Sequence, residues 1–281
     1  MDGIEIAIEW EWAALALAAA MVVLLPLELW HLYKKRVDRR RWLELLASAS
    51  PVLPTVMMGA VVTAFIVALN GGAAALAPWS IPTTPLTVLL SLLAVDFLYY
   101  WDHRCAHENR AYWAIAHSVH HSSPHFDQTT GLRVSFVDGF ISPWFYLPLV
   151  LIGFDPLLVL GSFGVIIAYQ QWLHTELIDK LPLFDGWLNT PSNHRVHHAI
   201  QPQYLDKNYG AILMIWDRMF GTYAREEERV QYGLTEQIES VNPIKVHFAE
   251  AAKLLRDVLN SRGVLQALAY LWHKPGWRPG N

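Results

Sequence analysis

Nine of the 13 histidines stand in three short boxes and at one single position, in a pattern that suits metal binding. The boxes and the single residue are His103-x3-His107, His117-x2-His120-His121, His194-x2-His197-His198 and His174. Residues three or four apart share one face of a helix, so each box is predicted to direct two or three imidazoles the same way. A pH sensor also uses clustered histidines, but it does not need eight of them on matched faces. The other histidines are isolated, and we interpret them as hydrogen-bonded or interfacial side chains: His31, His125, His247 and His273.

The number and type of these ligands indicate a pair of metal ions. Eight or nine imidazoles are too many for one ion and suit two, each with about four nitrogen ligands and room for another. Imidazole suits zinc, iron, copper or nickel, whereas magnesium and calcium prefer oxygen. A structural zinc site more often uses cysteine, and Cys105 is the only cysteine in the chain. A redox-active iron pair that binds dioxygen is the better fit, although ligand type alone leaves zinc open.

Acidic and phenolic side chains accompany the first box. Asp96, Tyr100, His103 and His107 follow one another at i, i+4, i+7 and i+11, which places them on one helix face. An Asp inside a membrane segment is costly and usually functional, and this one is predicted to hold a histidine tautomer by accepting its second N–H. The alternative is that Asp96 pairs with an arginine or a helix end. Glu108 directly follows a predicted ligand, and we assign catalytic roles to Glu108, Asp96 and Tyr100. The sequence does not rank the further candidates Asp102, Glu176, Asp206, Asn208 and Asp217.

The composition indicates that these residues belong to an integral membrane protein. Only 16% of the residues are charged, against about 25% in a soluble domain. Residues 45–95 carry no charged side chain, and 139–175 carry only Asp155. Because about 20 apolar residues cross a bilayer, we expect an all-α polytopic protein with four to five spans. The predicted spans are 11–33, 52–77, 84–101, 136–153 and 156–173.

The charge pattern orients these spans. Six of the eight residues 34–41 are Lys or Arg, and the positive-inside rule places this cluster in the cytoplasm. Alternating onward, loops 70–83 and 153–156 lie outside, whereas 102–135 and the chain after His174 are cytoplasmic. All the histidine boxes therefore fall on one side of the membrane. We expect a multi-pass protein of a bacterial inner membrane or the endoplasmic reticulum, with its active site facing the cytoplasm.

Two parts of this plan have alternatives. Pro143 and Pro148 interrupt the fourth predicted span, and Gly153–Pro156 leaves little room to turn, so the last two spans could form a re-entrant hairpin. Residues 244–272 have apolar side chains at helical spacing, as in an amphipathic helix on the membrane surface or packed on a cytoplasmic helical cap.

The domain organisation follows from these segments. We expect one domain over 1–281, with histidine boxes at 103–121 and 174–198 and C-terminal cytoplasmic or interfacial helices over 224–281. A net charge of −4 without a basic stripe gives no reason to expect nucleic acid as a partner.

The boxes resemble the fatty acid hydroxylase and sterol desaturase superfamily of membrane di-iron enzymes, whose signature is H-x3–4-H, H-x2-HH and H-x2-HH. Longer strings are similar to the alkylglycerol monooxygenase branch of that superfamily. These strings are Trp101–Arg104, His117–Ser123, Gln171–Glu176, Asn189–His198, Asp206–Gly210 and Trp216–Thr222. Departures from the pattern are Cys105 inside the first box and Pro124-His125 after the second.

The resemblance implies specific roles. The eight box histidines would bind two Fe(II) ions, His174 would be a further ligand or support the ligands, and Glu108 would take a functional part. Tetrahydrobiopterin would be the electron donor if the substrate is an ether lipid.

These observations lead to an O2-dependent lipid monooxygenase as the first hypothesis. A site at the cytoplasmic interface reaches carbons near a lipid headgroup, which favours alkylglycerols hydroxylated next to the ether oxygen, or acyl chains of polar lipids. The second hypothesis is a fatty-acyl, aminolipid or sterol hydroxylase or desaturase that receives electrons from a ferredoxin or cytochrome. A non-catalytic metal-binding or transport protein is a third, but transporters place their ligands near the bilayer midplane.

Overall fold

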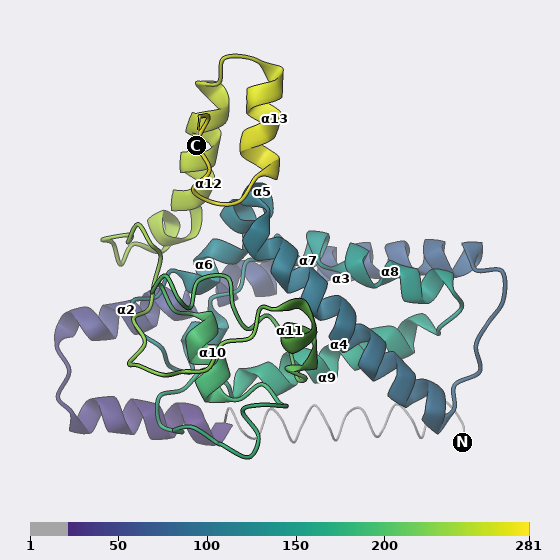
Figure 1. The fold of residues 1–281 in the computed structure, drawn as a ribbon, viewed down its shortest axis with the longest axis horizontal. Coiled ribbons are helices and arrows are strands. Elements are labelled where there is room, and N and C mark those ends of the chain that lie inside the picture. The colour runs from purple at the N-terminus through teal and green to yellow at the C-terminus, as the bar shows by residue number, and fades with distance from the viewer. Residues whose placement is uncertain (1–21, 281) are drawn as a thin grey trace.

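The computed structural model describes residues 22–280, and the regular structure in this range is helical (Figure 1). Its helices are a stretch over 22–34, α2 (Arg39–Ala49), α3 (Val52–Leu76), α4 (Pro85–Glu108), α5 (Arg110–Tyr112), the π-helix η1 (Trp113–His117), α6 (Ser118–His121), the 3-10 helix η2 (Thr130–Leu132), α7 (Asp138–Ile141), α8 (Pro143–Leu151), α9 (Pro156–Gln171), α10 (Pro191–His197), α11 (Ile215–Phe220), α12 (Pro243–Leu259) and α13 (Val264–Trp272). Two isolated β-bridges, and no β-strand, occur among the described residues. The all-α prediction is confirmed. Residues 11–21 of the first predicted span lie outside the described range.

Among residues 22–280, two helical segments are long and apolar enough to cross a bilayer: Arg39–Leu76, which joins α2 and α3, and Pro85–Glu108. The 25 residues of α3 extend over about 37 Å. Its apolar side chains are largely exposed, as at Leu53 (67%) and Met57 (72%). A continuous apolar surface of this kind is typical of contact with lipid.

The central helix α4 begins with a strong N-terminal signal and ends at the first histidine box. Thr84 and Thr87 form a capping box, and Pro85 stands at the first helical position. Its middle part packs against α9, where Ser91 and Ser162 share a hydrogen bond of 2.9 Å. The helix therefore extends from the apolar part of the molecule to the histidines.

The chain over 136–171 folds as a hairpin rather than as two full spans. α8 has nine residues with Pro148 inside, and α9 has 16, so both are shorter than the roughly 20 residues that a span requires. The prediction of one continuous span over 136–153 is wrong, because Pro143 starts a new helix after α7 and Gly153 turns the chain with φ of +101°. A hairpin in place of the last two spans is the alternative that Pro143, Pro148 and Gly153–Pro156 indicated in the sequence.

The turn of this hairpin is tied to the loop between α3 and α4. Trp79 Nε1 donates to the Ile152 carbonyl at 2.8 Å, and Ile81 N donates to the Gly153 carbonyl at 2.7 Å. A Cβ at Gly153 would lie 2.7 Å from the Trp79 carbonyl oxygen, so glycine is required there. The two loops that the charge pattern assigned to one side thus lie together.

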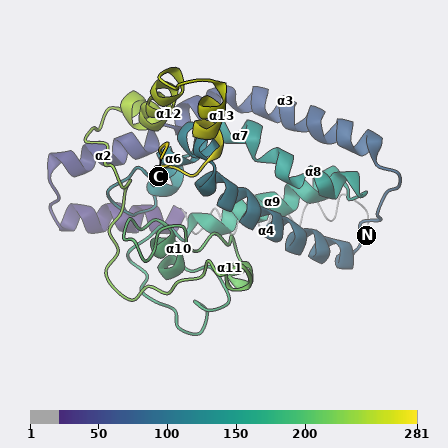
Figure 2. The same ribbon diagram turned by 45° about the horizontal axis from the view of Figure 1, so that its top comes forward.

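The C-terminal part is a helical hairpin that projects from the body of the molecule (Figures 1 and 2). The prediction of one helix over 244–272 is wrong, because Gly263 has φ of +143° and separates α12 from α13. Residues 224–242 are not helical. Leu254 and Tyr270 pack on Ala114 near the histidine boxes, whereas the outer face leaves Leu265 and Trp272 exposed.

Candidate metal centre

The structure brings the nine boxed and single histidines together in two groups. The potential ligand atoms of each group lie within 4.8 Å of one another. The group of five consists of His103, His107, His117, His121 and His197, and the group of four consists of His120, His174, His194 and His198. Seven of these side chains are buried and two are partly buried.

The two His-x2-His-His boxes divide their imidazoles between the groups. His117 and His121 enter the group of five, whereas His120 between them enters the group of four. His197 likewise separates from the other two histidines of its box. Each box therefore directs two of its imidazoles into one group, as predicted, and the third imidazole of each His-x2-His-His box enters the other group. Consecutive helical residues differ by about 100° in direction, so each HH pair faces both groups at once.

The spacing of the nitrogen atoms fits a metal ion in each group. The Nε2 atom of His117 lies 3.2, 3.1 and 3.2 Å from those of His103, His107 and His121. In the group of four, His174 Nε2 lies 3.3 Å from His120 Nε2 and 3.0 Å from His194 Nε2. Nitrogens bound at about 2.1 Å to one ion lie roughly 3.0–3.4 Å apart.

Backbone carbonyls orient three of the rings. The Nδ1 atoms of His103, His174 and His197 lie 2.9, 3.1 and 3.0 Å from the carbonyl oxygens of Tyr209, Gln170 and Lys207. A ring that donates from Nδ1 keeps the lone pair on Nε2 free for a metal. Nε2 of His197 and of His198 are buried without a hydrogen-bond partner among the described residues, as a metal ligand would be.

Burial keeps these imidazoles neutral. It lowers the pKa of His174 to about 4. Burial and the neighbouring histidines lower the pKa of His117, His121 and His198 well below the usual range. Neutral imidazole is the form that binds metal ions, so the groups are ready for metal at neutral pH.

The segment 208–217 supports the first box. Asp217 is fully buried and accepts hydrogen bonds from Tyr209 N (2.8 Å), Gly210 N (2.7 Å) and Thr222 Oγ1 (2.7 Å). This fixes the Tyr209 carbonyl that faces His103, and the Tyr209 ring also packs against three histidines. Tyr209 was not predicted as a site residue, although the string Asp206–Gly210 contains it.

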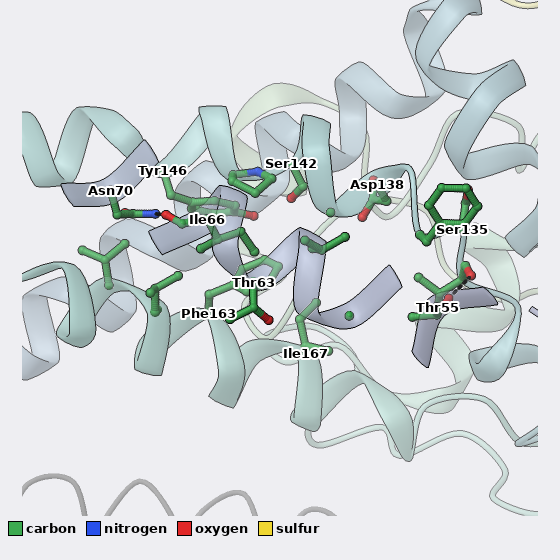
Figure 3. Close-up of a pocket in the computed structure, with 18 residues that line it drawn as sticks. Thr55, Thr63, Ile66, Asn70, Ser135, Asp138, Ser142, Tyr146, Phe163 and Ile167 are labelled. Atoms are coloured by element: carbon green, nitrogen blue, oxygen red, sulfur yellow. Dashed lines mark hydrogen bonds between the residues drawn. The ribbon is translucent and has the colours of Figure 1, made fainter. Parts of the chain in front are cut away.

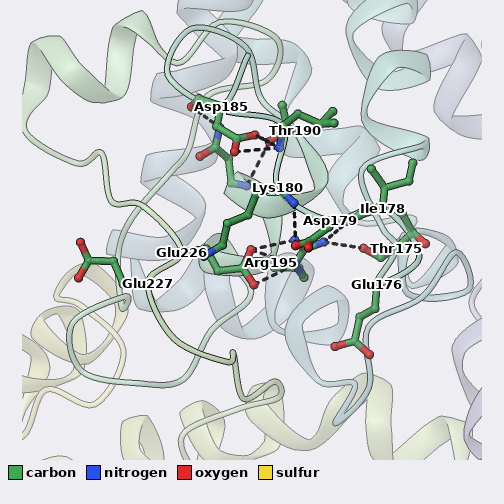
Figure 4. Close-up of polar contacts among 12 residues, drawn as sticks. Thr175, Glu176, Ile178, Asp179, Lys180, Asp185, Thr190, Arg195, Glu226 and Glu227 are labelled. Atoms are coloured by element: carbon green, nitrogen blue, oxygen red, sulfur yellow. Dashed lines mark hydrogen bonds and ion pairs between the residues drawn. The ribbon is translucent and has the colours of Figure 1, made fainter. Parts of the chain in front are cut away.

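A buried ion pair holds the third box in place (Figure 4). Arg195 pairs with Glu226 through two of its nitrogens, and its Nη1 donates to the carbonyls of Thr175 and Ile178 at 3.1 and 2.7 Å. Arg195 was not predicted as a site residue, although the string Asn189–His198 contains it. The arginine joins α10 to the loop that carries His174.

Asp96 and Tyr100 lie on the same helix face as the first box, as predicted, but they do not contact the imidazoles. Asp96 accepts from Ile212 N (2.9 Å), Leu213 N (3.3 Å) and Trp216 Nε1 (2.7 Å). The prediction that Asp96 holds a histidine tautomer is wrong, because its oxygens stabilise the segment before α11. The Tyr100 hydroxyl bonds to Thr222 and Arg104, so Tyr100 is a positioning residue in this geometry.

Glu108 follows His107 in sequence but points away from the two groups. Its carboxylate pairs with Arg104 Nε at 3.3 Å and Lys274 Nζ at 3.0 Å, and its side chain is 29% exposed. Glu108 therefore joins the end of α4 to the C-terminal segment.

We expect Glu108→Ala to lower the free energy of unfolding by about 1 kcal/mol or less, because exposed ion pairs contribute little. We expect its metal content to equal that of the parent protein. Elemental analysis and thermal unfolding check this. A loss of metal in Glu108→Ala would contradict the geometry and place the carboxylate in the centre.

Cavities approach the groups from two sides. One of about 130 Å³ is lined by His103, His117, His120 and His174. It adjoins a larger apolar cavity of about 310 Å³ between α3, α8 and α9 (Figure 3). Another of about 230 Å³ reaches His107, His121 and His197 beneath the C-terminal hairpin.

Comparisons with known proteins agree with the histidine pattern. The family model described as fatty acid hydroxylase matches residues 88–222. The chain is 41% identical over 203 residues to alkylglycerol monooxygenase of Xenopus tropicalis and 40% identical to that of Homo sapiens, with 72% of this chain and 44% of each relative covered. It is 33% identical over 138 residues to the ornithine lipid hydroxylase OlsE of Rhizobium tropici, with 48% of this chain and 41% of that protein covered. The chain spans less than half the length of these curated relatives. No solved structure matches it.

Proposed function

Since the chain belongs to the fatty acid hydroxylase family, we propose that it is a membrane-bound, O2-dependent lipid monooxygenase with two Fe(II) ions at its nine clustered imidazoles. The observation that carries this proposal is the division of these imidazoles into two groups at metal-ligand spacing. Iron bound there supplies the dioxygen activation that hydroxylation of a C–H bond requires.

The protein supplies ligand orientation and water exclusion. Carbonyls hold the rings of His103, His174 and His197, so these ligands need no reorganisation when a metal binds. Trp113 packs on His107 and His121, and Phe126 packs on three imidazoles of the group of four. These rings keep bulk water away from the reacting carbon.

We propose alkylglycerol as the substrate. The alkylglycerol monooxygenases at 40–43% identity support this choice, and so does an apolar cavity that adjoins the imidazoles. Insertion of one oxygen atom into the C–H bond next to the ether oxygen gives a hemiacetal, which breaks into a long-chain aldehyde and glycerol. Tetrahydrobiopterin is the proposed electron donor.

The proposal predicts aldehyde release by the purified protein. Iron-loaded protein in lipid nanodiscs, given 1-O-hexadecylglycerol, O2 and tetrahydrobiopterin, is expected to release hexadecanal, measured by mass spectrometry. Omission of O2 or of the pterin is expected to abolish the product.

The second candidate is an acyl, aminolipid or sterol hydroxylase or desaturase with a ferredoxin or cytochrome donor. The similarity to the ornithine lipid hydroxylase favours it. Hydroxylation of an acyl lipid, or turnover of alkylglycerol only with ferredoxin, would replace the first candidate by this one.

For the topology, we propose one integral membrane domain over 1–281 with four to five membrane segments, counting the α8–α9 hairpin, in a bacterial inner membrane or the endoplasmic reticulum. The basic cluster 34–41 supports a cytoplasmic active site.

Cysteine labelling tests this orientation. In a Cys105→Ser background, an impermeant thiol reagent on intact cells, or on sealed right-side-out vesicles, is expected to modify Ser80→Cys and to leave Glu227→Cys unmodified. Both positions are exposed in the structure. Strong labelling of Glu227→Cys from outside would reverse the orientation.

A further inference from the structure

Two adjoining cavities lead from the apolar helices to the imidazoles. The larger is lined mainly by apolar side chains of α3, α8 and α9 (Figure 3). The smaller, which we call the polar chamber, reaches both histidine groups. The two cavities share the lining residues Val134, Ser135, Asp138, Ser142, Phe163 and Ile167.

A pair of carboxyl groups stands where the cavities meet. Asp138 lines both of them, and Asp102 lines the polar chamber. The Tyr112 hydroxyl lies 2.7 Å from Asp102 Oδ1 and 2.8 Å from Asp138 Oδ1. A phenol has one proton and can donate to only one of these oxygens. The other contact therefore needs a proton on a carboxyl group, so the pair carries at most one negative charge when both contacts are hydrogen bonds.

The hydrogen bonds of this pair leave one oxygen free. Both oxygens of Asp102 have partners, because its Oδ2 accepts from Ser142 Oγ and, at 3.2 Å, from the Tyr146 hydroxyl. The second oxygen of Asp138 makes no hydrogen bond to any described residue. A polar atom at the end of an apolar cavity is costly unless a ligand or water pairs with it.

A second free acceptor lines the polar chamber. Gln171 Oε1 is buried and has no hydrogen-bond partner within residues 22–280. A Cβ added at Gly131 would lie 3.1 Å from this oxygen and 3.0 Å from His174 Nδ1, so the oxygen lies beside the imidazoles. A larger residue at position 131 would therefore crowd both side chains.

The charges on the chamber wall nearly balance. Arg133 is the cationic side chain among its lining residues, and its Nε and Nη1 atoms already donate to Ser48 and Ser122. Against it stands the carboxyl pair with its shared proton. The wall thus offers two free acceptors, at Asp138 and Gln171, while its charged side chains sum to about zero.

We propose that the polar chamber binds the hydroxyl groups of a neutral glycerol lipid, with Asp138 and Gln171 as the acceptors, while the apolar cavity holds its chain. This assignment rests on the proposed function and deepens it. It makes Asp138 and Gln171 residues that determine headgroup specificity, and it places the carbon between headgroup and chain next to the imidazoles.

Binding to redox-inert protein tests the assignment apart from turnover. Zinc-loaded protein in nanodiscs is titrated with 1-O-hexadecylglycerol and with its 2,3-di-O-methyl ether, which has the same chain and no donors. The parent protein is expected to bind the diol roughly 10- to 30-fold more tightly, the contribution of two hydrogen bonds. Asp138→Asn and Gln171→Met are each expected to bind the diol about 5-fold more weakly than the parent protein. Their affinity for the dimethyl ether is expected to equal that of the parent.

The control is Asp155→Asn at the distant start of α9, where Asn caps a helix as well as Asp does. Its preference for the diol is expected to equal that of the parent. Equal affinity of the parent protein for the two lipids would overturn the assignment. An equal loss of affinity for both lipids in Asp138→Asn and Gln171→Met would overturn it as well. A diol preference without hexadecanal formation would refute the proposed activity only, and hexadecanal formation without a diol preference would refute only this assignment.

Discussion

The protein is expected to bind two metal ions per chain, and His120→Ala and His197→Ala are each expected to reduce that number to about one. His120 belongs to the group of four imidazoles and His197 to the group of five, so each substitution removes a nitrogen from a different ion. We expect turnover to fall by more than about 100-fold in both, since losses of supporting residues alone cost 10- to 100-fold. Elemental analysis of purified protein, together with hexadecanal release, measures both effects.

The matched control is His31→Ala, an exposed histidine outside both groups, which is expected to keep two ions. A stoichiometry near one that neither substitution diminishes would contradict the two-metal centre. Zinc found in place of iron after overexpression would not contradict it, because imidazole sites bind zinc more tightly than Fe(II).

Asp217→Ala is expected to lower the free energy of unfolding by at least about 3 kcal/mol. The substitution removes a fully buried carboxylate and leaves Tyr209 N, Gly210 N and Thr222 Oγ1 without their acceptor. Because the same segment positions the Tyr209 carbonyl at His103, the group of five is expected to bind metal more weakly as well. Chemical denaturation of metal-free protein and metal competition with a chelator measure the two effects.

Asp179→Ala serves as the control, because Asp179 is exposed and its one side-chain hydrogen bond is to the adjacent Lys180 N–H. Its change in unfolding free energy is expected to stay within about 0.5 kcal/mol. A metal affinity for Asp217→Ala equal to that of the parent would show that the Tyr209 carbonyl does not position His103.

Local features of the sequence were enough to predict the composition of the centre and the character of its scaffold. Box spacing depends on helical periodicity, so the shared face of His103 and His107 could be predicted without knowing what lies opposite. Charge-free length likewise predicts apolar helices, and α3 begins at the predicted residue and ends one residue before the predicted limit. Pro143, Pro148 and Gly153 marked the hairpin because proline and glycine restrict or permit backbone conformations locally.

The partners of polar side chains required the tertiary structure. Asp96 was assigned to a histidine because both lie on one face of α4. The segment 212–216 packs against Asp96 on that face and donates the hydrogen bonds that its carboxylate accepts. Glu108 is adjacent to a ligand in sequence, yet the direction of its side chain and the position of Lys274 take it away.

The sequence by itself determined that nine imidazoles would meet, and the tertiary structure decided how they divide. The assignment of His120 and His121 to different groups depends on how α4, α6, α10 and the loop after α9 approach one another. Tertiary packing also brings Asp102 and Asp138, which are 36 positions apart in the sequence, to the same hydroxyl group of Tyr112. Helical periodicity acts over a few residues, so the spacing of those residues is enough to predict which of them share a face. Contacts between distant segments depend on the packing of the whole chain, which no local pattern encodes.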